Sequence, residues 1–187
     1  MVLLANGFAE RGIATDLVLA NAEGPYLAEV SPNVRVIDLG ASRVIRSLPG
    51  LARYLRRERP LALLSALNHA NVIACLAHRL AGVPTRLVVS EHNHLSLSIK
   101  TEPSRRGRLM HWFMRYAYPW ADGVVAVSAG VADDLARVIA LPHKSITVIY
   151  NPVVGEQTLS RANAEVDHPW FAPGEPPVVL GVGREPR

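Results

Sequence analysis

The sequence predicts a doubly wound α/β fold, in which helices cover a parallel sheet. Short apolar runs alternate with amphipathic segments from residue 15 to residue 150. Several of these runs are continuously apolar instead of alternating with polar residues, which is typical of strands buried on both faces of a parallel sheet. Helical segments separate most of the runs, and a helix is the usual crossover between parallel strands.

Six strands and five helical segments are expected from these patterns. The strands cover residues 15–20, 34–39, 61–66, 86–91, 123–128 and 146–150, and the helices cover 2–12, 43–59, 69–82, 104–120 and 128–140. The first helical segment has the pattern of the second half of a helix. Pro49 should kink or break the second segment, and Gly82 should stop the third. Ser104 and Ser128 should cap the last two.

The composition is that of a soluble globular protein, with 49% hydrophobic and 19% charged residues among 187. No apolar run reaches the roughly 18 residues that span a bilayer, and the start of the chain lacks the basic region of a signal peptide. The one cysteine, Cys75, lies in an apolar helical segment and cannot form an internal disulfide. It is therefore expected to be a core residue, and a cytoplasmic location is favoured.

The basic residues are concentrated in two clusters, although the net charge is only +4. They are Arg43, Arg46, Arg53, Arg56, Arg57 and Arg59, and Arg105, Arg106, Arg108 and Arg115. Both clusters can be solvated helix faces, or a surface for an anionic membrane or a phosphorylated ligand. Trp112, Phe113 and Tyr116 accompany the second cluster; they suit core packing or, if exposed, peripheral membrane docking. Nucleic acid is not an expected partner, because stacking aromatics and nucleic-acid motifs are missing.

Polar side chains follow several expected strands at their carboxyl ends, the edge where open parallel sheets bind ligands. They are Asn68 after the third strand, Glu91, His92, Asn93 and His94 around the end of the fourth, Ser128 after the fifth and Asn151 after the sixth. Asn68 and Ser128 also suit helix caps, the helix at Ser128 also suits an anion, and Asn151 suits a turn. No second cluster with metal-ligand spacing occurs, so no metal is expected.

Five segments then occur in a recognisable order, namely LANGFAERGIATDLVLA, LVVSEHNH, ADGVVAVSAGVADDL, ITVIYNPV and VVLGVGR. In order and spacing they resemble the N-terminal half of a retaining glycosyltransferase of family 4 with the GT-B fold. The closest similarity is to the bacterial group that adds sugars to polyprenyl-diphosphate carriers or to nascent surface polysaccharides. The resemblance extends over nearly the whole chain.

The resemblance implies a Rossmann-like, acceptor-side domain over residues 1–154, without the first strand and glycine-rich loop of the family. Residues 155–176 would form the hinge and linker. Residues 177–187 would be the first strand of a C-terminal donor-binding domain that is otherwise absent, so the chain is expected to be inactive alone. One minor departure is Arg59-Pro60-Leu61, where family members often have Arg-Pro-Asp.

The resemblance also implies an activity, namely transfer of a sugar from a nucleotide-diphosphate donor to a saccharide or polyprenyl-linked acceptor, with retention at the anomeric carbon. No cofactor besides the nucleotide sugar would be needed. His92 would hydrogen-bond the transferred sugar, and Gly183 and Arg184 would hold the donor diphosphate. The side chains expected to line the acceptor side of the cleft are Glu91, Asn93, His94, Asn68, Ser128 and Asn151.

Other functions remain open from the sequence alone. A non-catalytic α/β ligand-binding module and an orphan half-domain that only binds are compatible with the same strand pattern. A nucleotide-sugar epimerase with the GT-B fold is a further alternative, because it would differ mainly in its C-terminal half.

Overall fold

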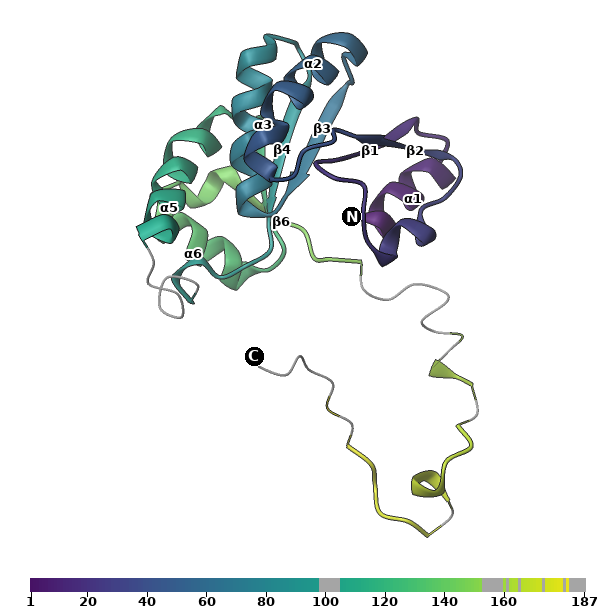
Figure 1. Cartoon of the computed structure of the whole chain (residues 1–187). Coiled ribbons are helices and arrows are strands. Elements are labelled where there is room, and N and C mark those ends of the chain that lie inside the picture. The colour runs from purple at the N-terminus through teal and green to yellow at the C-terminus, as the bar shows by residue number, and fades with distance from the viewer. Residues whose placement is uncertain are drawn as a thin grey trace. The chain divides into compact units, whose positions relative to one another are not determined.

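In the computed structural model of the chain, residues 1–97, 105–152, 160, 162–164, 166–172, 174–179 and 181 are described, with only the backbone of residues 105, 106 and 108. Two compact units make up the chain, residues 1–151 and 152–187. Within the described part, all strands belong to the first unit (Figure 1). The second unit includes a short 3-10 helix, η5 (Pro169–Phe171), whose Trp170 N–H donates to Nδ1 of His168 at 3.2 Å.

All six strands expected between residues 15 and 150 are present, each within two residues of its expected bounds. They are β1 (Thr15–Leu19), β2 (Val34–Asp38), β3 (Ala62–Ala66), β4 (Arg86–Glu91), β5 (Gly123–Ala126) and β6 (Ile146–Val148). Every pairing between neighbouring strands in the described residues is parallel. The α/β class and the parallel arrangement predicted from the sequence are therefore confirmed.

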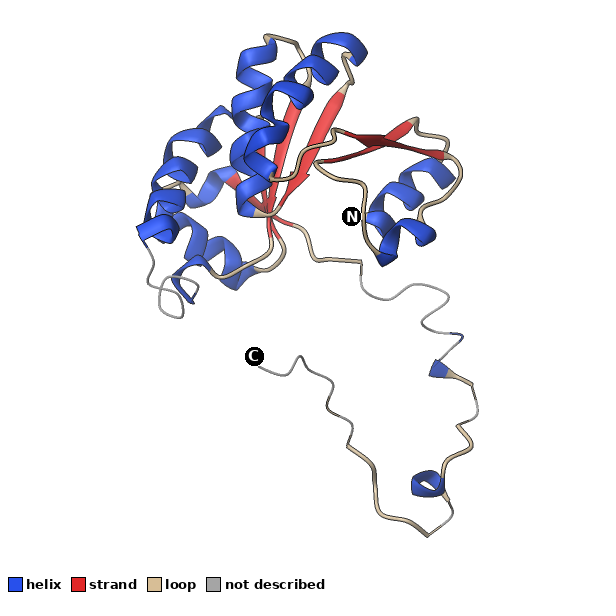
Figure 2. Cartoon of the chain, viewed as in Figure 1, coloured by secondary structure: helices blue, strands red, loops and turns tan. Residues whose placement is uncertain are grey.

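The parallel strands are divided between two sheets. One sheet has the order β1-β2 and the other the order β3-β4-β5-β6, and Figure 2 shows them as two separate groups of strands. No ladder joins β1 to β3 in the part of the chain that the structure describes. The apolar pattern alone does not reveal this division, because it reports burial and not the identity of the neighbouring strand.

Polar contacts from one helix, α2 (Leu48–Glu58), join the two sheets. The hydroxyl of Tyr54 donates to the carboxylate of Asp16 on β1 at 2.6 Å. Arg35 on β2 bonds the same carboxylate through Nε at 2.9 Å and reaches Glu58 at 3.0 Å. Both Tyr54 and Glu58 lie on α2, and α2 packs against α3 (Asn68–Ala81), which lies over β3 and β4.

The helices largely follow the sequence signals. They are α1 (Val2–Glu10), α2, α3, α5 (Arg105–Ala117) and α6 (Ala129–Ile139), with the 3-10 turns η1 (Pro25–Glu29), η2 (Val44–Ser47), η3 (Tyr118–Trp120) and η4 (His143–Ser145). Gly82 ends α3 in the left-handed region with φ 62°, and the hydroxyl of Ser128 accepts from the Val131 N–H at 3.2 Å, capping α6. The expected cap at Ser104 lies outside the described residues.

The expected helix 43–59 is interrupted near Pro49, but not by a kink in the middle of one helix. The segment forms η2 and then α2, and Pro49 occupies the first turn of α2. Proline is well tolerated there, because the amide hydrogen that it lacks would have no partner inside the helix. The break therefore falls before the proline and not after it.

The main core lies between the four-stranded sheet and its helices. Leu55, Leu87, Leu135 and Cys75 are fully buried in it. Burial raises the pKa of the Cys75 thiol to about 12, so the thiol stays protonated and unreactive at neutral pH. This confirms the prediction that Cys75 is a core residue. Among the described helices, none has both the length and the apolar character needed to cross a membrane.

The strand expected at residues 177–187 is not formed in the part of it that the structure describes. Residues 177–179 and 181 have no strand pairing, and Val179 is 95% exposed. An apolar strand is not stable without a partner strand, which accounts for the unpaired backbone. Residues 180 and 182–187, including Gly183 and Arg184, lie outside the described residues.

Ala140, the residue that ends α6, provides a test of the helix ends. It adopts φ 55° and ψ 40°, a left-handed conformation that costs a residue with a Cβ about 1 kcal/mol. Ala140→Gly is therefore expected to raise the free energy of unfolding by about 1 kcal/mol, measured by urea denaturation. Gly82→Ala is the reciprocal change and should lower it by a similar amount, because alanine is strained at φ 62°. Only open space surrounds the added Cβ, so no steric clash adds to that cost. A loss of stability in Ala140→Gly would contradict this interpretation of the cap.

Candidate functional site

The register of the parallel strands brings the predicted site residues to one edge. Ser90 of β4 lies opposite Ala66 of β3 and Val125 of β5, and Ala126 of β5 lies opposite Val148 of β6. The segments that leave these strands therefore emerge together at the carboxyl edge of the sheet. Those that follow β3, β4, β5 and β6 carry Asn68, the residues 92–94, Ser128 and Asn151, respectively.

His92 makes polar contacts with two neighbouring side chains at this edge. Its imidazole is partly buried, with Nε2 at 3.1 Å from the Ser90 hydroxyl and Nδ1 at 3.5 Å from Nδ2 of Asn151. Burial lowers the pKa of His92 below its ordinary value, so the ring is neutral at neutral pH. With the Asn151 amide facing Nδ1, the arrangement fits the tautomer whose proton on Nε2 is donated to Ser90.

Glu91 does not face the outside of this edge, although the sequence analysis expected an acceptor contact there. It is 0% exposed. Its Oε1 accepts from the backbone N–H groups of His92 and Asn93 at 3.2 and 3.4 Å, and its Oε2 accepts from the Tyr118 hydroxyl at 2.9 Å. Burial raises the pKa of Glu91, and the three donors only partly offset it. The side chain is thus enclosed by the protein and holds the backbone that follows β4.

Asn93 and His94 are exposed, as a ligand contact requires. The His94 ring lies close to the start of α6, where a Cβ added to Gly130 would come within 3.3 Å of its Cε1. Glycine at this position lets the ring approach the helix N-terminus. The Ser128 hydroxyl is already used as the cap of α6, so the structural explanation of Ser128 is observed.

Asp134 on α6 is a buried residue that supports this edge from below. It is 2% exposed, and its Oδ2 accepts from the Ser96 N–H at 2.9 Å while Arg137 bonds Oδ1 at 2.7 Å. Burial would raise the pKa of Asp134, but the bonds from Ser96 and Arg137 outweigh burial and lower it. An ionised Asp134 therefore ties α6 to the helical residues 95–97 that follow His94. Ser96 lies 38 residues from Asp134 in the sequence, so no local sequence pattern predicts this contact.

Asn68 is not the cap of α3 that its position suggested. The cap position is Leu67, without a side-chain hydrogen bond, and Asn68 is the first residue of the helix. Leu67 has φ 77° and ψ 134°, a region that residues with a Cβ rarely adopt. Strain of this kind gathers at ligand-binding edges, and here it lies beside Asn68 at the end of β3.

The donor-phosphate residues expected from the sequence, Gly183 and Arg184, lie outside the described residues, so no geometry relates them to His92. Among the described side chains, no three histidine, cysteine, aspartate or glutamate residues gather to hold a metal ion. The arrangement that remains is a neutral imidazole beside exposed amide and imidazole groups. Chemically, it can exchange hydrogen bonds with the hydroxyl groups of a ligand.

Comparison with known proteins agrees with the fold. The sequence profile of the family described as Glycosyltransferase Family 4 matches residues 1–156. No curated protein matches the chain at a significant level. The matched range contains all six strands and every described candidate residue at their carboxyl edge. The chain therefore belongs to glycosyltransferase family 4.

Proposed function

We propose that this chain supplies the acceptor side of a retaining glycosyltransferase. The donor would be a nucleotide-diphosphate sugar, and the acceptor a saccharide or a polyprenyl-linked sugar used in cell-surface polysaccharide synthesis. The reaction would take place at the cytoplasmic face of the membrane that holds such acceptors. Membership of the family supports a glycosyltransferase in general, and the remaining detail rests on the residues at the carboxyl edge.

The neutral, doubly hydrogen-bonded ring of His92 is the observation that carries this proposal. Positive charge develops at the sugar ring when a glycosidic bond breaks. A neutral imidazole can bond a sugar hydroxyl without repelling that charge, whereas an imidazolium would oppose it. The contact of Nδ1 with Asn151, at 3.5 Å, is at the outer limit of a hydrogen bond, so a sugar hydroxyl can replace it at little cost.

The proposal divides the substrate between two sets of residues. His92, Asn93, His94 and Asn151 would contact sugar hydroxyls from the first unit. Gly183 and Arg184 would hold the donor diphosphate, together with the second domain that the resemblance implies. A guanidinium suits paired phosphate oxygens, and glycine lets the backbone approach them. The sugar contacts are therefore the part of the proposal that the first unit can test.

Replacement of His92 tests the sugar contact. We expect the 187-residue chain to bind UDP-N-acetylglucosamine, UDP-glucose or GDP-mannose weakly, detected by saturation-transfer NMR on the sugar protons. His92→Ala should weaken binding about three- to tenfold, the usual effect of losing one hydrogen bond between neutral groups.

His143→Ala is the matched control. His143 is an exposed histidine that pairs with Asp133 at 2.9 Å, and it precedes β6, whereas the candidate site follows the strands. Nucleotides without a sugar, UDP and GDP, control for binding through the diphosphate alone. Equal affinities in His92→Ala and the unchanged chain, with sugar signals present in both, would contradict the role of His92.

The outer face of α5 supports peripheral membrane contact. Four apolar side chains on this face are 40–53% exposed, namely Leu109, Trp112, Phe113 and Tyr116. The Trp112 ring centroid lies 5.3 Å from that of Phe113 and 4.6 Å from that of Tyr116. Met114, in contrast, is fully buried. An amphipathic helix with an exposed aromatic stripe is typical of the membrane interface.

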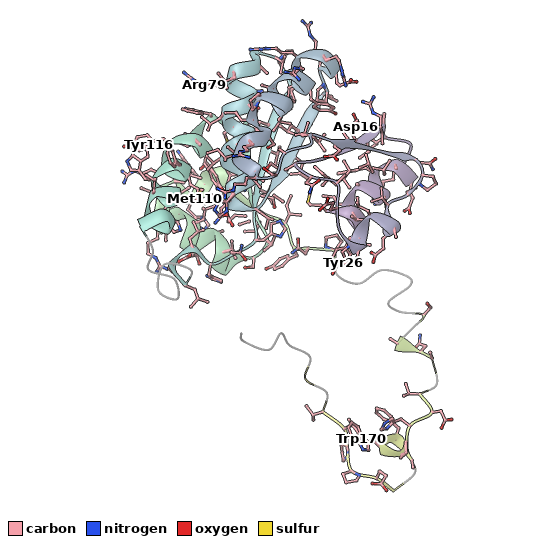
Figure 3. The ribbon with its side chains drawn as sticks, in the orientation of Figure 1. Asp16, Tyr26, Arg79, Met110, Tyr116 and Trp170 are labelled. Atoms are coloured by element: carbon pink, nitrogen blue, oxygen red, sulfur yellow. The ribbon has the colours of Figure 1, made fainter. Side chains whose placement is uncertain are left out.

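One arginine, Arg79, accompanies this stripe on the neighbouring helix α3. Arg79 of α3 stacks over the Trp120 ring at 4.8 Å, and α3 packs against α5. Figure 3 shows Arg79 and Tyr116 on the same side of the first unit. Such cations favour anionic lipid. Two arginines of α2 instead have partners within the protein. Arg56 donates to the carbonyl of Ala81 at 3.3 Å, and Arg57 pairs with Glu58 at 2.7 Å.

Vesicle co-sedimentation tests the membrane contact. At low salt, the chain is expected to bind vesicles of phosphatidylcholine and phosphatidylglycerol, and less so vesicles of phosphatidylcholine alone. Trp112→Ala should reduce the partition coefficient about tenfold, because inserting a large aromatic side chain contributes at least about 1.5 kcal/mol.

Trp170→Ala is the control for this experiment, since Trp170 is similarly exposed, at 62%, but belongs to the second unit. Binding that depends equally on Trp112 and Trp170 would indicate non-specific adsorption. Absence of binding to anionic vesicles at low salt would contradict the membrane contact altogether.

A further inference from the structure

A carboxylate without a cation is buried directly beneath the candidate site. Glu91 ends β4, is 0% exposed, and takes part in none of the ion pairs found among the described residues. A buried carboxyl group costs stability unless hydrogen bonds compensate for the water that it loses. Packing alone would be served better by an apolar side chain of similar volume, so the bonds that Glu91 makes need an explanation.

These bonds form a directional chain across three elements. Nδ2 of Asn71 on α3 donates to the Tyr118 hydroxyl of η3 at 3.0 Å, and that hydroxyl donates to Oε2 of Glu91 at 2.9 Å. Nδ2 of Asn71 also donates to the carbonyl of Ser90 at 2.9 Å. All three side chains are fully buried. Each donor in the chain therefore fixes the next acceptor, and β4 is held at Ser90 and Glu91 together.

This chain of hydrogen bonds ends at the backbone of the candidate site. Oε1 of Glu91 accepts from the N–H groups of His92 and Asn93, which have left the strand. The Glu91 carbonyl accepts from the Val127 N–H at 3.2 Å, the last backbone contact of β4 with the β5 segment. Beyond this point, the described ladder gives the loop no further pairing with β5. The Glu91 carboxylate therefore supplies hydrogen-bond partners for the His92 and Asn93 amides in place of strand pairing.

An unpaired atom of Asn71 indicates that the geometry of this hydrogen-bond chain costs stability. Oδ1 of Asn71 is buried and has no hydrogen-bond partner. An orphaned buried acceptor lowers stability. A side chain whose only task was to fill this space would avoid that cost, whereas one whose Nδ2 must orient Tyr118 and Ser90 cannot.

We propose that Glu91 is a positioning residue for His92: with Asn71 and Tyr118, it fixes the backbone from which His92 and Asn93 project toward the ligand. This role rests on the proposed function only for the importance of His92. It replaces the direct contact with the acceptor that the sequence suggested for Glu91. Ser90, held through its carbonyl by Asn71, then accepts a hydrogen bond from the His92 ring at its hydroxyl oxygen, so the same hydrogen-bond chain orients both the backbone and the ring.

Tyr118→Phe tests the role, because it removes one hydroxyl and leaves the ring in place. We expect amide hydrogen exchange at His92 and Asn93 to accelerate about tenfold, since the acceptor of those amides loses its own support. The pKa of the His92 ring, followed by NMR titration, should rise toward its ordinary value as the loop opens to water. Neither readout requires a sugar, so failure of the sugar-binding test and failure of this test are distinguishable.

Tyr54→Phe is the matched control. Tyr54 is also a buried tyrosine, 6% exposed, whose hydroxyl donates to a carboxylate, that of Asp16, at 2.6 Å. It should leave exchange at His92 and Asn93 and the His92 pKa unchanged, even where its loss of overall stability is similar. The same changes in both variants would mean general loosening and would overturn the proposal, as would no change in Tyr118→Phe.

Glu91→Gln is the second variant, should Tyr118→Phe fail to fold. A glutamine keeps the volume, but its one carbonyl oxygen cannot accept from both Tyr118 and the backbone amides. The His92 readouts should therefore change in the same direction. Because Tyr118 and Glu91 act through one bond, the double variant should change them no more than the larger single change. Full additivity of the two changes in the His92 readouts would contradict an action through one shared hydrogen bond.

Discussion

Parallel pairing of β4 with β3 on one side and β5 on the other is the constraint on which the candidate site depends. The register places Ser90 opposite Ala66 and Val125, so that the residues after each strand emerge at one edge. β6 extends the same register through β5 and brings Asn151 near His92. Ligand binding at the carboxyl edge of a parallel sheet follows from this geometry before any particular side chain is considered.

The sequence was sufficient for features that depend on local chemistry. Continuous apolar runs indicated the strands, and Gly82 and Ser128 marked helix ends, because a left-handed glycine and a hydroxyl cap act on their own backbone. It also placed His92 and Asn151 at the edge where they lie. The division into two sheets was not predictable in this way, because the apolar pattern of a strand does not specify which strand pairs with it.

Long-range hydrogen bonds were the other feature that the sequence did not reveal. A glutamate at the end of a strand suggests an exposed group, yet Glu91 is buried, and the Tyr118 hydroxyl bonds it from 27 residues away. Asp134 likewise holds Ser96 across 38 residues. Tyr118 directly follows α5, the helix that exposes Trp112 and Tyr116. One continuous segment therefore supports the site from inside and presents an aromatic surface outside.

Family membership, parallel register and a neutral His92 together make contact between this imidazole and a sugar the central claim. The most direct measurement is the set of intermolecular nuclear Overhauser effects between the His92 ring protons and a bound nucleotide sugar such as UDP-N-acetylglucosamine. The account predicts contacts from the His92 ring to sugar-ring protons. Contacts from a bound sugar to other parts of the chain, with none to His92, would contradict it.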